Sequence, residues 1–126
     1  MNFSVFTPGT IVCANYRDFN GVERVGIFCI IYDEQLDPSM NYKKNVLGVK
    51  VTTSLGLCTN YCVALNDGFN NFFDKDCLAL CSKPHVLEKE ACYKVIGVLS
   101  RTTFKKVYKE YKQFERELER QMLDYI

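Results

Sequence analysis

Two stretches of the sequence gather cationic side chains of the kind that bind phosphate. The first runs from Tyr42, Lys43 and Lys44 to Lys50, and the second is the segment 101–126. Lysine neutralises phosphate charge and a tyrosine ring can stack on a nucleobase, so each stretch is a candidate nucleic-acid contact. The formal net charge of the chain is only +1. A protein of that charge does not coat nucleic acid indiscriminately, so any such site is a local patch.

The second stretch has the period of one long amphipathic helix that follows Ser100. Its apolar residues recur at steps of three and four, and Thr102 or Thr103 is the expected N-cap. At 100° per residue the cationic side chains fall on one flank: Lys105, Lys109, Lys112, Arg116 and Arg120. This flank is a candidate phosphate contact, and a solvated helix face is the alternative interpretation.

The residues before this helix have the composition of short strands joined by turns. The Asn20-Gly21 dipeptide predicts a tight hairpin, and the segment 33–45 predicts a long loop. Residues 76–81 fit either a strand or a helical turn, and a break is expected at Lys83-Pro84. Strands are predicted over residues 10–16, 24–32, 46–53, 61–65 and 91–99. Five or six short strands predict a mainly β (α+β) fold, a small antiparallel barrel with a C-terminal helix.

Length and composition narrow the class of protein. With 126 residues, 48% of them apolar, the chain has the material for one core, so we expect one domain over residues 1–126. The longest apolar run, 27–32, is far below the roughly 18 residues of a membrane span. The first residues lack the basic and apolar regions of a secretory signal, so we expect a cytoplasmic protein without a membrane partner.

Seven cysteines raise the question of a disulfide framework or a metal site. An odd number of cysteines in a cytoplasmic chain argues against disulfides. The spacing of Cys58 with Cys62, and of Cys77 with Cys81, is tolerable for zinc, but these residues lie among apolar, strand-like neighbours. We therefore expect buried thiols, no metal and no cofactor. His85 follows a proline and is expected in an exposed loop.

Four motifs, in chain order, resemble the MazF/PemK/Kid toxins and the related ToxN/CptN toxins that RNA antitoxins neutralise. Residues 8–12, Pro-Gly-Thr-Ile-Val, resemble the family's opening Pro-Gly-Asp-Ile-Val, and Arg24 heads the second predicted strand. Residues 49–54 end the third strand with Thr-Thr-Ser, and residues 95–99, Val-Ile-Gly-Val-Leu, precede the helix. The resemblance spans nearly the whole chain. It implies an SH3-like barrel and a metal-independent endoribonuclease that cleaves single-stranded RNA.

The resemblance also implies which residues form the active site. In the family, an arginine at the head of the second strand works with a threonine or serine at the end of the third. The matching residues here are Arg24 and the triplet Thr52, Thr53 and Ser54. The residue after Arg24 is valine, where the protein-neutralised toxins usually have proline. This departure favours the RNA-neutralised branch, in which a Thr-Ser pair, here Thr53-Ser54, lies in the active groove.

Metal-free cleavage of RNA can use the neighbouring 2′-hydroxyl as nucleophile and leaves a 2′,3′-cyclic phosphate. Arg24 would then bind the scissile phosphate, and one hydroxyl of the triplet would hold a phosphate oxygen or the 2′-hydroxyl. Lys50 would stabilise the anionic intermediate or donate a proton. Strand alternation predicts Lys50, Thr52 and Ser54 on one face and Thr53 on the other, so that only one of these sets reaches a given groove.

The family likeness implies partners as well. We expect an RNA substrate, no DNA partner, and a cognate antitoxin that is either a protein or an RNA. A homodimer is a further expectation, with the aromatic segment 69–73 either in its interface or folded onto the core. The alternative function is a non-catalytic SH3-like module that binds RNA or protein, because a barrel fold alone implies no activity. A serine or cysteine hydrolase has little support, since His85 has no evident partner.

Overall fold

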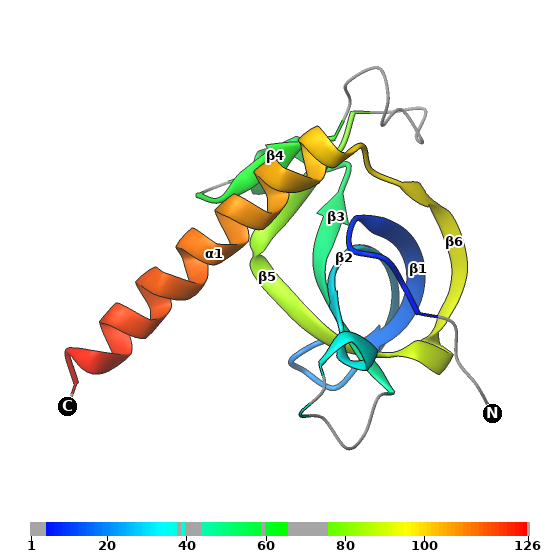
Figure 1. Ribbon diagram of the computed structural model, residues 1–126, viewed down its shortest axis with the longest axis horizontal. Coiled ribbons are helices and arrows are strands. Elements are labelled where there is room, and N and C mark those ends of the chain that lie inside the picture. The colour runs from blue at the N-terminus through cyan, green and yellow to red at the C-terminus, as the bar shows by residue number, and fades with distance from the viewer. Residues whose placement is uncertain (1–4, 38, 40–43, 59, 66–75, 126) are drawn as a thin grey trace.

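The computed structural model describes residues 5–37, 39, 44–58, 60–65 and 76–125 (Figure 1). Tyr42, Lys43 and the aromatic segment 69–73 lie outside the described residues. The elements run in chain order as follows: β1 (Thr10–Arg17), β2 (Glu23–Asp33), η1 (Glu34–Leu36), β3 (Asn45–Thr52), η2 (Leu55–Leu57), β4 (Cys62–Ala64), β5 (Leu78–Glu88), η3 (Lys89–Ala91), β6 (Cys92–Val98) and α1 (Arg101–Leu123).

In the described part of the chain six strands form one antiparallel sheet in the order β4-β5-β3-β2-β1-β6. The sheet curls round on itself, so that β6, β1, β2, β3 and β5 surround a common interior, and α1 lies against β4 and β5 (Figure 1). This arrangement confirms the predicted mainly β fold with a long C-terminal helix. No helix within the described segments has both the length and the apolar character needed to cross a membrane.

Alternation along β2 divides the apolar residues between two clusters. Successive side chains of a strand point to opposite faces, and β2 is buried on both. Cys29 and Ile31 pack in the larger cluster, which also holds Val107 and Tyr111 of α1. The second cluster takes the intervening side chains of β2 and their neighbours: Phe28, Ile30, Val12, Ala14, Val46 and Leu87. The candidate site described below lies at the edge of this second cluster.

The predicted hairpin joins β1 to β2, with a loop longer than the Asn-Gly dipeptide alone would make. Asp18 shapes the loop, because its Oδ1 accepts hydrogen bonds from the backbone N–H groups of Asn20 and Val22, each at 3.0 Å. Gly21 has a φ of +80°, a conformation that glycine adopts without strain. The hairpin register places Tyr16 opposite Arg24 and therefore brings both residues to one end of the sheet.

The prediction that Lys83-Pro84 breaks the chain is wrong, because β5 continues through it. Val49 of β3 pairs with Pro84, whereas the next residue, Lys50, pairs with Leu80. The intervening residues 81–83 of β5 therefore bulge out of the ladder. A bulge is a place where a strand tolerates proline, which has no N–H to donate. As a result His85 lies within β5, opposite Gly48, and the prediction that it lies in an exposed loop is also wrong.

The N-cap of the C-terminal helix lies two or three residues before the expected positions. Ser100 is the N-cap, and its hydroxyl oxygen accepts a hydrogen bond from the Thr103 backbone N–H at 3.2 Å. Thr103 is buried within the first turn of α1. The prediction of Thr102 or Thr103 as the cap is therefore wrong, although the helix itself is confirmed. Serine is as strong an N-cap as threonine, so the sequence did not decide between them.

A buried ion pair joins the N-terminal segment, η1 and η3. Lys89 Nζ lies 2.8 Å from Asp33 Oδ1, and the two side chains are 1% and 0% exposed. The carboxylate also accepts hydrogen bonds from the backbone N–H groups of Phe6, at 2.8 Å, and Gln35, at 2.9 Å. Lys89 donates to the Gln35 side chain as well. Both charges are therefore paired within a region that excludes water, and each depends on the other.

We predict that Lys89→Met lowers the free energy of unfolding by about 3–5 kcal/mol, because it leaves the Asp33 carboxylate buried without its cation. The matched control is Lys94→Met, which removes an exposed lysine of β6 and is expected to change stability by less than about 0.5 kcal/mol. Urea denaturation of the three proteins measures the difference. If the two variants have the same free energy of unfolding, the Asp33 carboxylate does not need Lys89 to be stable in its buried position.

Candidate functional site

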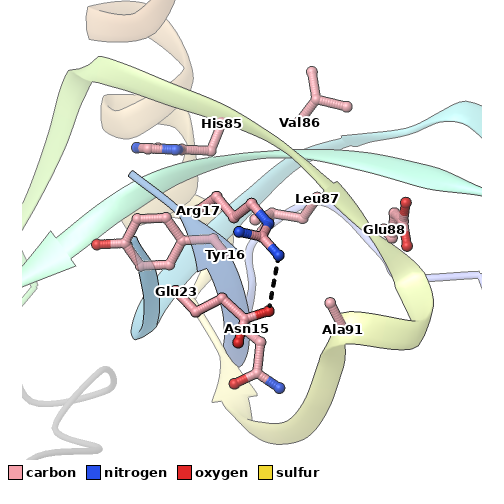
Figure 2. A pocket seen from close by; sticks show the side chains of 9 residues that line it. All are labelled: Asn15, Tyr16, Arg17, Glu23, His85, Val86, Leu87, Glu88 and Ala91. Atoms are coloured by element: carbon pink, nitrogen blue, oxygen red, sulfur yellow. Dashed lines mark hydrogen bonds and ion pairs between the residues drawn. The ribbon is translucent and has the colours of Figure 1, made fainter. Parts of the chain in front are cut away.

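Three rings from three different strands meet beside the β1–β2 hairpin. Tyr16 of β1, Phe28 of β2 and His85 of β5 have pairwise centroid separations of 5.2 Å, with near-perpendicular planes. Figure 2 shows the Tyr16 and His85 rings one above the other. Phe28 is fully buried, while Tyr16 and His85 are partly exposed. The cluster therefore packs two partly exposed polar rings against one buried apolar ring.

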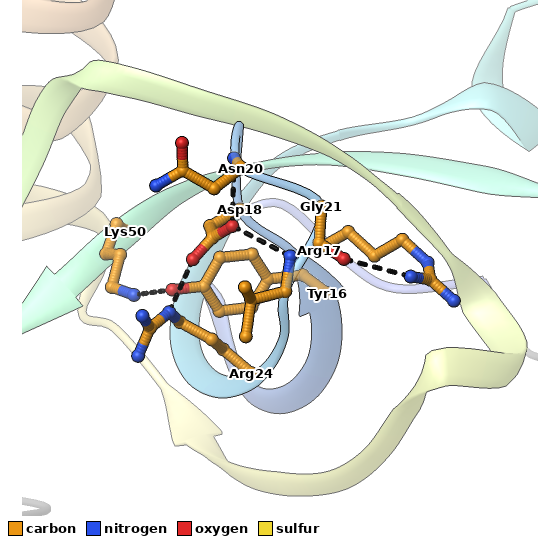
Figure 3. Close-up of polar contacts among 8 residues, drawn as sticks. Tyr16, Arg17, Asp18, Asn20, Gly21, Arg24 and Lys50 are labelled. Atoms are coloured by element: carbon orange, nitrogen blue, oxygen red, sulfur yellow. Dashed lines mark hydrogen bonds and ion pairs between the residues drawn. The ribbon is translucent and has the colours of Figure 1, made fainter.

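Lys50 extends from β3 onto this cluster. Its Nζ donates a hydrogen bond to the Tyr16 hydroxyl and lies 4.3 Å from the centroid of the Tyr16 ring (Figure 3). The same atom is 5.9 Å from the Phe28 centroid. An ammonium near aromatic rings is stabilised electrostatically, so these contacts fix the position of the Lys50 charge. Register explains the placement, because Lys50 pairs with Phe28 across β2 and β3.

Gly26 makes room for this arrangement. A Cβ at residue 26 would lie 2.8 Å from Tyr16 Cε1, 3.1 Å from Phe28 Cε2 and 3.4 Å from Lys50 Nζ. The Tyr16 ring therefore rests directly on the backbone of β2, and no larger residue fits there without moving it. Glycine inside a strand often marks such a close approach. This is the signal in the sequence that could have pointed to Tyr16, which the sequence analysis did not select.

Arg24 stands at the head of β2, held by the hairpin loop. Its Nε donates to Asp18 Oδ2 at 2.6 Å, and the Arg24 side chain is 57% exposed (Figure 3). The hydrogen bond from Arg24, and secondly the bond from the Val22 N–H, lower the pKa of the Asp18 carboxyl. Glu23, which precedes Arg24 in the sequence, pairs with Arg17 at 3.3 Å. Within the described residues the structure records no partner for the Arg24 Nη groups.

Lys50, Thr52 and Thr53 line one hollow of about 230 Å³, together with Val25, Gly26, Ile27, Val51 and Cys77. The strand β3 ends at Thr52, so Thr53 and Ser54 lie beyond it. Ser54 leaves the strand direction, since its backbone N–H donates to Thr52 Oγ1 at 3.0 Å and η2 follows. Thr52 and Thr53 therefore border the same hollow, and Ser54 is not part of its lining.

The cations of the helix are not brought to this hollow. Lys112 pairs with Glu115 at 2.8 Å, and Arg120 pairs with Glu117. Arg116 lines a different hollow beside Tyr61, which shares no lining residue with the hollow at Lys50. The other predicted RNA contacts that the structure describes remain exposed: Lys44 at the start of β3, and Lys105 and Lys109 on α1.

The cysteines are free thiols. Within the described residues, no three His, Cys, Asp or Glu side chains gather closely enough to hold a metal ion. Cys77 and Cys81 are buried, and burial raises the pKa of Cys81 to about 12. At neutral pH such a thiol is protonated and behaves as a small apolar side chain.

We predict that His85 titrates below the ordinary pKa of 6.5. Partial burial disfavours the imidazolium and lowers the pKa, and the positive charges of Lys50 and Lys83 lower it further. Protonation of His85 is disfavoured only in the folded state. The free energy of unfolding therefore decreases as the pH falls below 6.5. The chain has one histidine, so proton NMR of the imidazole ring gives its pKa without assignment.

Removing the Lys50 charge tests whether this lysine helps to lower the pKa of His85. Lys50→Met should raise the pKa of His85 toward 6.5, whereas Lys106→Met, at an exposed position on α1, should leave it where it is. A His85 pKa at or above 6.5 in the wild-type protein would contradict the placement of this ring beside Lys50.

Solved structures of similar fold include three from mycobacteria. An endoribonuclease from mycobacterial species superposes with a TM-score of 0.65 and 13% identity, over 88% of this chain and 91% of that one. An endoribonuclease in complex with its cognate antitoxin, also from mycobacterial species, gives 0.62 and 13%, over 84% and 90%. The Mycobacterium tuberculosis toxin MazF-mt6 gives 0.55 and 15%, over 83% and 96%. No family model and no curated protein match the sequence. The chain therefore has the MazF fold, with little sequence identity to these structures.

Proposed function

We propose that this protein is an endoribonuclease of the toxin class, which cleaves single-stranded RNA in the cytosol without a metal ion. The observation that carries the proposal is the position of Arg24, Lys50 and the Thr52-Thr53 pair. On a fold similar to those of a mycobacterial endoribonuclease and of the toxin MazF-mt6, the two threonines and Lys50 border one hollow. Arg24 immediately precedes the first residue of that lining, Val25.

In the proposed reaction the 2′-hydroxyl oxygen attacks the adjacent phosphorus, and the bond from phosphorus to the 5′-oxygen breaks. The hydroxyl proton passes to a base, and the departing 5′-oxygen receives a proton, so the products are a 2′,3′-cyclic phosphate and a 5′-hydroxyl. The enzyme's tasks are to orient the 2′-hydroxyl, to move these two protons and to stabilise the dianionic phosphorane. None of these tasks requires a bound metal ion.

Arg24 is suited to hold the scissile phosphate. Asp18 occupies its Nε, so the guanidinium is oriented before any substrate arrives. Two Nη groups can then donate parallel, charge-assisted hydrogen bonds to the non-bridging oxygens. A donor held in advance costs no reorganisation during the reaction, which is the main advantage of an enzyme site over water.

Lys50 and the threonines complete the proposed site. The Lys50 ammonium is held by the Tyr16 hydroxyl, where it would stabilise the phosphorane or supply the proton for the leaving oxygen. Thr52 or Thr53 would hold a phosphate oxygen or the 2′-hydroxyl. The exposed cations Lys44, Lys105 and Lys109 are proposed as contacts to more distant phosphates, whose energetic share depends on salt.

The same comparison supports an antitoxin partner, because one similar structure is an endoribonuclease bound to its cognate antitoxin. We propose that an antitoxin, either protein or RNA, covers the hollow at Lys50, and that the toxin pairs as a homodimer. The second candidate function is a non-catalytic module that binds RNA or protein. The ion pair of Arg24 with Asp18 favours this binding module, because such pairs are common on protein surfaces that have no catalytic role.

We predict that Arg24→Ala lowers the rate of RNA cleavage in EDTA about 100- to 1,000-fold, as removal of one preorganised donor typically does. The matched control is Arg101→Ala at an exposed arginine of α1, which should cleave like the wild type. Circular dichroism confirms that each variant is folded. Intact RNA with the wild-type protein would favour the binding module, and wild-type cleavage by Arg24→Ala would remove Arg24 from the site.

A further inference from the structure

Tyr16 and His85 also form the wall of a second, larger hollow. It encloses about 450 Å³ between the end of β1 and the second half of β5 (Figure 2). That volume lies within the range of sites that bind small organic groups. The lining consists of the two rings, the polar residues Asn15, Arg17, Glu23 and Glu88, and the apolar residues Val86, Leu87 and Ala91.

This larger hollow adjoins the proposed catalytic site through one side chain. The Tyr16 ring lines the larger hollow, while its hydroxyl accepts the hydrogen bond from Lys50, which lines the smaller one. The hairpin register adds a second connection, since Arg24 lies opposite Tyr16 and the next pair is Arg17 with Glu23. An RNA chain whose phosphate is bound at Arg24 therefore has this hollow beside it.

The charges of the two hollows differ. The smaller hollow is lined by one cation, Lys50, and by no carboxylate, whereas the larger one contains two carboxylates, Glu23 and Glu88, against the single cation Arg17. Arg17 is itself paired with Glu23 at 3.3 Å, and burial and nearby lysines lower the pKa of His85, which keeps that ring neutral near pH 7. Such a hollow repels phosphate and accepts hydrogen bonds from neutral N–H donors.

The walls suit a flat aromatic group. Unstacked bases of single-stranded RNA stack on tyrosine and histidine rings and on arginine guanidinium planes. Tyr16, His85 and Arg17 supply these surfaces, and Figure 2 shows Glu88 across the hollow from the Tyr16 ring. A carboxylate accepts hydrogen bonds from the amino group of cytosine. Adenine and guanine carry amino groups as well, whereas uracil does not.

We propose that this larger hollow binds an unpaired nucleobase adjoining the scissile phosphate, and that it favours bases with an exocyclic amino group over uracil. The proposal rests on the proposed ribonuclease function, because it treats the nucleobase as part of the RNA substrate. Glu88 is the residue that determines the preference, and Tyr16 and His85 provide the stacking surface.

The first experiment measures binding without catalysis. Trinucleotides with 2′-O-methyl sugars, identical except for a central cytosine or uracil, are titrated into the wild-type protein and followed through the ring protons of its one histidine. We expect a saturable shift of the His85 signals, with cytosine bound about 10-fold more tightly than uracil, within the range of one good base contact. Absence of any saturable shift with either trinucleotide would overturn the proposal.

Glu88→Ala tests the source of the preference. The variant should lose the roughly 10-fold discrimination while still shifting His85, because it removes the hydrogen-bond acceptor and leaves the stacking surface. The matched control is Glu90→Ala, at an exposed acid two residues further on that does not line the hollow, and it should keep the wild-type preference. Discrimination retained in a folded Glu88→Ala protein would overturn the assignment.

Cleavage of a randomised RNA, with the cut sites sequenced, separates this proposal from the proposed function. Wild-type protein should enrich amino-bearing bases at one position beside the cut, and Glu88→Ala should relax that enrichment. If the RNA stays intact but the trinucleotides bind with a Glu88-dependent preference, the ribonuclease function fails and the base site stands. Cleavage with no Glu88-dependent enrichment leaves the ribonuclease function and overturns the base site.

Discussion

The candidate site depends on the close approach of the Tyr16 ring to the backbone of β2 at Gly26. Because residue 26 has no side chain, the ring lies within 2.8 Å of where a Cβ would be and still packs at right angles to Phe28. Its hydroxyl is thereby placed to hold the Lys50 ammonium. Any larger residue would have to displace the ring, and overpacking of this kind typically costs about 1–3 kcal/mol. The position of the charge and the packing of the second apolar cluster are therefore coupled.

The bulge in β5 determines where His85 lies in the candidate site. By placing residues 81–83 outside the ladder, it lets the strand pass Pro84 and brings His85 against Tyr16 and Phe28. One ring, Tyr16, then lies between a hollow lined by the Lys50 cation and a hollow with two carboxylates. Such a division matches the chemistry of a nucleotide, in which an anionic phosphate is joined to a neutral base with its own donors and acceptors.

The sequence was sufficient to predict the strands with clear turn signals, the hairpin at Asn20-Gly21 and the amphipathic helix, because these depend on local pattern. It was insufficient wherever the outcome depended on pairing between distant strands. Pro84 indicated a break because a bulge in β5 leaves no local trace, and His85 was missed with it. Tyr16 is an ordinary β-strand residue until the fold brings Lys50 to it. The rule of strand alternation does not extend to Thr53 and Ser54, because β3 ends at Thr52, one residue before its expected end.

The central claim is that the 2′-hydroxyl of the RNA is the nucleophile and that the site around Arg24 and Lys50 directs its attack. The most direct measurement uses one RNA with a mapped cut site and a second RNA that differs by a single 2′-deoxyribose at the nucleotide whose 2′-hydroxyl would attack. Both are incubated with the protein in EDTA. The first RNA should be cut to a 2′,3′-cyclic phosphate, and the second should remain intact at that bond. Cleavage of the deoxy-substituted bond at a comparable rate would contradict the mechanism.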